Sequence, residues 1–486
     1  MKKTLLFVTM SILNLLFLKC YSQSVKLQNS VQYNVESGIF LSNGTTPFWQ
    51  RANQYGTVPN NGGFLTLRGE LEADYKKDSL SQNKHFFGIG GSFWGVANVG
   101  RANQAILPEG YLKAHLGKFE FWGGRRRETF GLVSDTTLST GAYSWSGNAL
   151  PLPKIQINTL GFVEIPFTKG WLAFKGSFAH GWFGDLKIPD NYTVNHLNTY
   201  LHQTSFFGRA GKPSSKFRVY AGFVHNAQWG NEDKYLDPNL SFIESLVGVA
   251  IGTSVKSSRI GNHLGSIDFG FDMHGKNWNI IFMRQTAFEA GALYWLRAIP
   301  DGLNSLSFVR KVQSNSNPSK VFIKKITLEF LHTTNQGGAI RDTVIGIYGQ
   351  EQYFNHYIYS QGWSYQNKII GTPFITRTDD AKPIWPTSSN SNNSRVYVWH
   401  VGALGTYQNW NWQTKLSLSQ NWGNYGGELA GKPLQFSGIF MASKPISLLG
   451  GCELKTSLSF DIGQLYYNSI GLYVGIKKQG ILSAHK

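Results

Sequence analysis

The chain has 486 residues and a formal net charge of +18, from 46 Lys and Arg against 28 Asp and Glu. Such a surplus favours an anionic partner. No stretch after the N-terminal segment offers the ~20 consecutive apolar residues of a spanning helix, so a helical membrane protein is excluded, and no cofactor or metal-ligand cluster is indicated.

Residues 1–22 have the pattern of a secretory signal peptide: two lysines, an apolar run and then KCYSQS, with cleavage near Ser22. Lipidation of Cys20 is an alternative, but Lys19 stands where a lipoprotein signal has a small residue. Removal of the signal leaves Cys452 as the single cysteine, so no intramolecular disulfide can stabilise the exported chain. Export also makes nucleic acid a poor partner, and acidic polysaccharide or lipid phosphate fits better.

Several later stretches alternate apolar and polar residues, as two-faced strands do. In SIDFGFDMH, residues 266–274, Ile267 and Phe269 share one face, while Asp268 and Asp272 share the other. The same alternation appears in residues 172–180, 217–228, 321–332, 412–422 and 453–462.

These runs predict an all-β outer-membrane protein. Soluble sandwich strands usually have about 5–6 residues, whereas a tilted strand that crosses a bilayer needs about 9–11. The 15 Trp, 22 Tyr and 33 Phe suit interfacial girdles. Since a sheet in lipid must close on itself, we expect residues 23–486 to form one antiparallel transmembrane β-barrel of about 16–18 strands with a polar lumen.

The polar connections at 226–248, 299–320 and 376–395 read as long loops, which predicts that they lie outside the cell. The first strand is expected near Tyr33, which leaves no room before it for a separate plug domain and weakens an active-transport reading. The end of the chain, after GLYVGIKK, carries no terminal aromatic residue, so the residue at which the last strand ends is hard to assign.

Two longer motifs carry a family resemblance. They are STGAYSWSGNALPLPKIQI, residues 139–157, and QEQYFNHYIYSQGWSYQNKIIGTPF, residues 350–374. With the strands around them, they resemble the Wzi capsule-assembly family in the form common among Bacteroidetes, over most of the mature chain. The resemblance implies an outer-membrane barrel that acts as a lectin, holding capsular polysaccharide on the cell surface and organising it there.

An arginine run at the end of FEFWGGRRR, residues 119–127, is the first candidate binding site. Strand alternation puts Arg126 on the lumen face and Arg125 and Arg127 on the other, unless the preceding glycines form a bulge. Guanidinium groups suit the carboxylates of uronic acids. The alternative is a barrel rim at which the three arginines pair with lipid phosphate or Glu128.

The two motifs supply the other candidates. Trp145 can stack on a sugar and Asn148 can hydrogen-bond hydroxyls, although this motif also reads as a fold-specific turn with a stiff proline exit. The second motif gathers rings and polar groups as a sugar site does, but it equally fits an aromatic girdle and an internal loop. Its candidate residues are Tyr353, Asn355, Tyr357, Tyr359 and Trp363.

The sequence therefore predicts a non-enzymatic outer-membrane lectin for an anionic capsular or exopolysaccharide, in contact with outer-membrane lipid and plausibly monomeric. A porin or polysaccharide exit pore is the alternative and would need an open lumen. A barrel enzyme that uses Asp268 and Asp272 is a third reading, since glycoside hydrolysis needs two carboxylates at a suitable separation.

Overall fold

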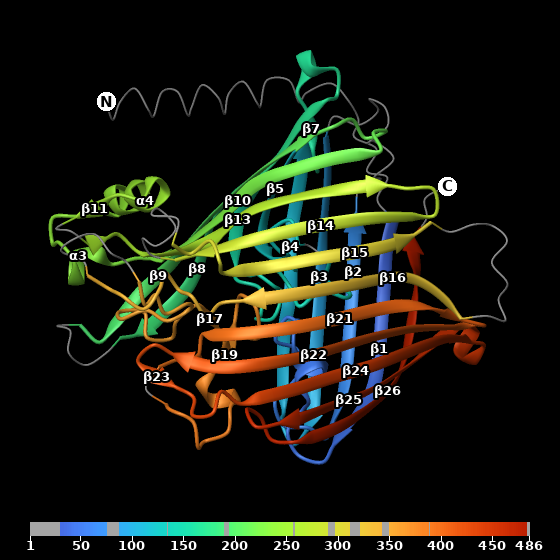
Figure 1. Ribbon diagram of the computed structural model, residues 1–486. Helices are drawn as coiled ribbons and strands as arrows, with labels where there is room; N and C mark the ends of the chain where they lie inside the picture. Colours follow the sequence, from blue (N-terminus) through green and yellow to red (C-terminus); the bar gives the residue numbers. More distant parts are fainter. Residues whose placement is uncertain are drawn as a thin grey trace.

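The computed structural model describes residues 30–74, 87–133, 135–188, 194–255, 258–289, 297–311, 321–342, 349–387 and 389–483. The predicted signal peptide lies outside these residues. They form an 18-strand antiparallel barrel (Figure 1) that closes where β1 (Ser30–Ser42) pairs with β26 (Ser469–Ser483). The fold class is therefore confirmed, with a strand count at the upper end of the expected range.

Each barrel strand pairs with its neighbour in the chain, and β6 and β7 together count as one strand because both pair with β8. Between β1 and β26 the barrel strands are β2 (Phe64–Asp74), β3 (Phe87–Gly100), β4 (Gln104–Leu116), β5 (Phe119–Arg125), β6 (Lys154–Thr159), β7 (Val163–Glu164), β8 (Leu172–Lys187), β9 (His196–Ala210), β10 (Phe217–Trp229), β13 (Asn262–His274), β14 (Trp278–Phe288), β15 (Gly302–Arg310), β16 (Phe322–His332), β21 (Arg395–Tyr407), β22 (Trp410–Asn424), β24 (Leu434–Ile446) and β25 (Cys452–Gly463).

All the alternating runs named from the sequence lie in barrel strands, and their faces point as expected. In β13, Ile267 and Phe269 are each 49% exposed on the outer wall, whereas Asp268 is buried inside. In β25, Ile462 is 58% exposed outside and Asp461 is buried inside. Apolar side chains thus face the lipid, and polar ones face the lumen.

Aromatic rings gather on the outer wall at one end of the barrel. The ring centroids of His332 and Tyr397 are 4.7 Å apart, those of Phe330 and Trp399 are 5.5 Å apart, and those of Tyr397 and Trp422 are 5.8 Å apart. These residues sit where β16 and β22 end and β21 begins, next to long connections. This arrangement matches the interfacial girdle expected from the aromatic content.

The two ends of the barrel differ. At the end that carries the start of β1 and the end of β26, β4 and β5 are joined by two residues, and so are β21 and β22. The opposite end, on the left in Figure 1, carries the long connections with α3 (Glu232–Tyr235), α4 (Phe242–Ile251) and β23 (Gly427–Glu428). Short turns face the periplasm in such barrels, so we call the long-connection end the extracellular end.

One predicted loop is wrong. The stretch 299–320 contains β15, whose Ser305 and Ser307 face the lumen and whose Leu306 lies between them. Its residues 312–320 lie outside the described residues. The stretches 226–248 and 376–395 do leave the barrel at the extracellular end, and the first holds α3 and most of α4. Among the described residues, no helix has the length and apolar character to cross a membrane.

Candidate functional site

Three connections from the extracellular end fold back into the lumen, and together we call them the plug. They are the inner loop (residues 43–63), the strap (residues 126–153) and the cap (residues 349–394), in each case their described part. In the strap, residues 138–152 are all buried. The lumen is thus filled by segments of the barrel itself.

The strap leaves β5 and crosses to the far wall. The backbone N–H of Leu132 donates to Asp268 on β13 at 2.6 Å, and the backbone N–H of Thr140 donates to Glu329 on β16 at 2.6 Å. His400 on β21 hydrogen-bonds the carbonyl of Leu138 at 2.7 Å. Buried polar groups of the wall therefore serve as anchors for the strap backbone.

The inner loop is held on a neighbouring part of the wall. Its short helix α2 (Phe48–Arg51) begins where the Phe48 N–H donates to Asp461 on β25 at 2.8 Å. The Trp49 indole N–H donates to Ser417 on β22 at 3.0 Å, and the Ser457 hydroxyl donates to Gln50 at 2.8 Å. Each contact pairs a plug group with a lumen-facing strand residue.

The cap includes β17 (Ser364–Tyr365), β18 (Lys368–Ile369), β19 (Thr376–Arg377) and β20 (Ser391–Asn393). An ion pair joins the cap to the inner loop, because Arg51 lies 3.1 Å from Asp380. Burial opposes ionisation of Asp380, but the positive charges of Arg51, Lys368 and Arg377 together outweigh it and hold the pKa of that carboxyl below its ordinary value. The plug segments therefore hold one another as well as the wall.

All three predicted arginines turn inward. Arg126 pairs with Glu120 at 2.6 Å and lies over the Tyr111 ring, as its lumen placement predicts. Arg127 contacts Glu109 at 3.1 Å, and Arg125 donates to Tyr365 of the cap at 3.0 Å. Both contacts correct the alternation that put Arg125 and Arg127 on the outer face.

The reason for the correction is that β5 ends at Arg125, after Gly124 with a φ of 129°. The chain there turns into the lumen, which fits the break at the glycines that the sequence left open. Burial opposes the charge on Arg127, but the carboxylates of Glu109 and Glu70 raise its pKa. Arg126 and Arg127 neutralise lumen carboxylates, and all three arginines turn inward rather than toward the lipid rim.

Trp145 and Asn148 lie at the junction of the three plug segments. The Asn148 side chain accepts from the Asn53 N–H at 3.1 Å and donates to the Ile369 carbonyl at 2.9 Å. Trp145 is buried, with its ring centroid 6.1 Å from that of Trp363. Gly147 has a φ of 81°, so the predicted tight turn is present.

The second motif is mostly interior. Tyr353, Tyr359 and Trp363 are fully buried; Tyr353 donates to Asp301 at 2.9 Å and the Trp363 indole donates to the Ser144 carbonyl at 2.7 Å. Asn355 is partly buried and donates to the Ser391 carbonyl at 2.9 Å. Tyr357, at 64% exposure, is the member that reaches the surface.

The carboxylates weighed as catalytic residues have partners in the wall. Asp268 accepts from Ser266, Gln285 and the strap, while Asp272 is 2.5 Å from Arg218. The sequence did not single out Glu329 or the lumen carboxylates of β2 and β4. Their signal was present as charged residues on the polar faces of strands. Within the described residues, no group of three metal-ligating side chains comes together.

The fold and the lumen define the class: the chain is an outer-membrane β-barrel of 18 strands. No family model and no curated protein matches its sequence. Among solved structures, it is similar to Wzi of Escherichia coli, an outer-membrane protein involved in group 1 capsule assembly and a carbohydrate-binding β-barrel. The TM-score is 0.55 at 11% identity, covering 93% of this chain and 85% of that one.

Two barrels of Pseudomonas aeruginosa are also similar in fold. OccK5 has a TM-score of 0.47 and 8% identity over 94% of this chain and 99% of that one. The outer membrane protein OprD has a TM-score of 0.47 and 8% identity over 94% of this chain and 95% of that one. At these identities, all three likenesses concern the fold alone.

Proposed function

We propose that this protein is a Wzi-like, non-enzymatic lectin of the outer membrane, which retains an anionic capsular or exopolysaccharide at the cell surface and aids capsule assembly. The observation that carries the proposal is the filled lumen. A binding protein can work with such a lumen, whereas a pore for ions or a polymer needs a continuous aqueous path. The strap and inner loop are fixed to the wall by hydrogen bonds from several strands.

The surface of the cap offers chemistry that suits sugars. Tyr357 provides an exposed ring, and nearby exposed residues carry amides and a hydroxyl. Rings stack on the C–H faces of sugars, and amides both donate to and accept from hydroxyls. Among the exposed amide and hydroxyl residues of the cap are Gln352, Ser360, Gln361, Gln366 and Asn367.

Two further features support the assignment. The net charge of +18 favours an acidic polymer over a neutral one. The chain also shares a barrel fold with the carbohydrate-binding Wzi, in addition to the two motifs that resemble its family. A porin or exit pore is the competing function, and it would require the plug to move.

Binding of the purified, detergent-solubilised protein to the surface polysaccharide of its own cells tests the proposal, across a salt series. We expect saturable binding that weakens with salt, and Tyr357→Ala is expected to weaken it. Tyr407→Ala is the matched control because Tyr407 is 43% exposed at the periplasmic end. Absence of binding by folded wild type, together with ion conductance in planar bilayers, would favour the pore.

A further inference from the structure

A cavity lies between the plug and the wall, on the periplasmic side of α2. It has a volume of about 370 Å³. Trp49, Gln50 and Gln54 of the inner loop line it on one side. Strand residues of the barrel wall, among them Ser443 and Lys455, line it on the other. Pockets of a few hundred cubic ångströms commonly take small ligands.

The position of the lining residues shows which end of the barrel the cavity belongs to. Lys324 lies at the start of β16, and Ser443 and Lys455 flank the short turn between β24 and β25. These strand ends lie at the periplasmic end, where β1 begins. The plug therefore stands between this cavity and the extracellular surface proposed above as the lectin face.

The charged side chains that line the cavity carry a net positive charge. Glu36 is the single lining carboxylate, against Arg68, Lys324 and Lys455. Lys455 lies 2.7 Å from one oxygen of Glu36, Arg68 lies 4.0 Å from the other, and the Tyr473 hydroxyl also donates to that second oxygen, at 2.6 Å. One carboxylate thus serves two cations, and Lys324 adds a third.

Several neighbouring acids on the same wall have cations of their own. Asp74 pairs with Lys113 at 2.7 Å. Glu109 and Glu120 pair with Arg127 and Arg126. Glu70 and Glu72 follow Arg68 on the same face of β2, and Glu70 shares Arg127 with Glu109. The net positive charge is therefore that of the cavity lining, in which an anion would meet partly desolvated cations.

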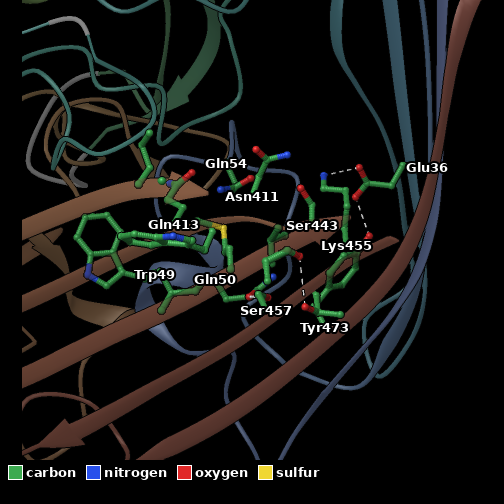
Figure 2. Close-up of a pocket in the computed structure, with 18 of the residues that line it drawn as sticks. Glu36, Trp49, Gln50, Gln54, Asn411, Gln413, Ser443, Lys455, Ser457 and Tyr473 are labelled. Carbon is green, nitrogen blue, oxygen red and sulfur yellow. Dashed lines mark hydrogen bonds and ion pairs between the residues drawn. The ribbon is translucent and has the colours of Figure 1, made fainter. Parts of the chain in front are cut away.

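The remaining polar lining suits a hydroxylated ligand. Gln50, Gln54 and Asn411 contribute amides, and Ser443 and Ser457 contribute hydroxyls. Amides and hydroxyls both donate and accept, as a sugar ring requires. Lys455 lies beside Glu36 at one end of the cavity (Figure 2), and Arg68 contacts the same carboxylate. The arrangement fits a ligand that has hydroxyls along its length and a carboxylate at one edge.

We propose that this cavity is a second saccharide site, which binds a hexuronate unit from the periplasmic side of the barrel. Arg68 and Lys455, the two cations beside Glu36, bind the carboxylate, and the amides of the inner loop bind ring hydroxyls. The site is separated from the lectin face by the plug, so either proposal can fail without the other.

Titration of the purified full barrel with D-glucuronate, followed by saturation-transfer NMR, tests the site. D-glucose is the matched ligand because it keeps the ring hydroxyls and lacks the carboxylate. We expect saturable glucuronate binding, and binding of glucose weaker by about tenfold or more, the loss of one charge-assisted contact. Equal binding of both sugars, or no glucuronate binding, would overturn the proposal.

Three variants locate the binding. Arg68→Gln removes a cation, and Ser443→Trp fills the cavity; each should weaken glucuronate binding about tenfold or more. Lys444→Gln is the matched control, since Lys444 neighbours Ser443 in β24 but does not line the cavity and lies over the Trp410 ring. Heat-modifiable migration on gels verifies folding. Unchanged binding in folded Ser443→Trp would place the ligand elsewhere, and Tyr357→Ala should leave glucuronate binding intact.

Discussion

Thr140 and Glu329 join nearly opposite sides of the barrel. The backbone N–H and the hydroxyl of Thr140 donate to the same carboxylate oxygen, at 2.6 and 2.7 Å, and Ser305 donates to the other oxygen at 2.9 Å. Thr140 belongs to the strap that leaves β5, while β16 lies far around the ring of strands. This one carboxylate fixes the middle of the plug to the wall.

Loss of that anchor should loosen the plug without opening the barrel. Glu329→Ala leaves the buried Thr140 donors without their acceptor, at a cost of about 1–3 kcal/mol. The strand ladder is untouched, so folded barrel is expected to form. We expect raised ion conductance in planar bilayers for this variant. Glu164→Ala, at an exposed acid in β7, is the control, and equal conductance in both would show that Glu329 does not hold the plug.

Arg127 should be needed for stability. Arg127→Met leaves Glu70 and Glu109 without their cation, and its side chain is 30% exposed. Because solvent screens these ion pairs, we expect the free energy of unfolding to drop by less than the about 3–5 kcal/mol lost when a fully buried pair is broken. Urea unfolding in lipid vesicles measures it, with exposed Arg101→Met as control. A loss no larger than that of the control would mean that the pairs contribute little.

Two aromatic residues of the cap should differ in how much their replacement by alanine lowers stability. Trp363 is fully buried and bonded to Ser144, so Trp363→Ala is expected to cost about 3–5 kcal/mol of stability. Tyr357 is exposed, so Tyr357→Ala should change stability by less than about 0.5 kcal/mol. Urea unfolding of both variants checks this. A small effect at Trp363 would argue against the plug as a packed structure.

His356 should make the cap sensitive to acid. Burial lowers the pKa of His356 to about 3, and its Nδ1 accepts from the Ile358 N–H at 3.2 Å. An unfolded histidine titrates near about 6.5. Between about pH 6.5 and 3, His356 is protonated in the unfolded state but stays neutral in the folded state. The free energy of unfolding should therefore decrease as the pH is lowered through this range. Thermal melts of wild type and His356→Asn should diverge over this range, and parallel curves would contradict the assignment.

Cysteine labelling of intact cells can test the orientation. Tyr357→Cys should react with a membrane-impermeant maleimide, while Tyr407→Cys should not until the outer membrane is opened. The native Cys452 is buried and gives little background. The reverse labelling pattern would place the long connections in the periplasm.

The strands could be predicted because alternation is a local signal. Residues 266–274 and 453–462 needed only the order of their own side chains to indicate both faces. The exception was β15, in which Asn, Ser and Gly are common enough to look like a loop. Arg126 could be placed in the lumen by the same local argument, whereas Arg127 could not, because Gly124 breaks the register.

The interior of the plug could not be predicted in this way. Tyr353, Tyr359 and Trp363 have the composition of a sugar site, but a loop that folds into a polar lumen needs the same mixture of rings and hydrogen-bonding groups. The two cases differ only in which distant residues the rings meet. Trp363 meets Ser144, far away in the chain, and no local pattern encodes that contact.

Closure of the barrel also dictates an order of assembly. The seam joins β1 to β26, so the ring is complete only when the last strand has been delivered. The inner loop follows β1 at the start of the chain, yet its anchors Ser417, Ser457 and Asp461 belong to strands near the end. The inner loop can bond to the strap early, but its contacts with the wall must wait for nearly the whole chain. Contacts between such distant segments form slowly. Insertion into the membrane and sealing of the interior are thus parts of one late event.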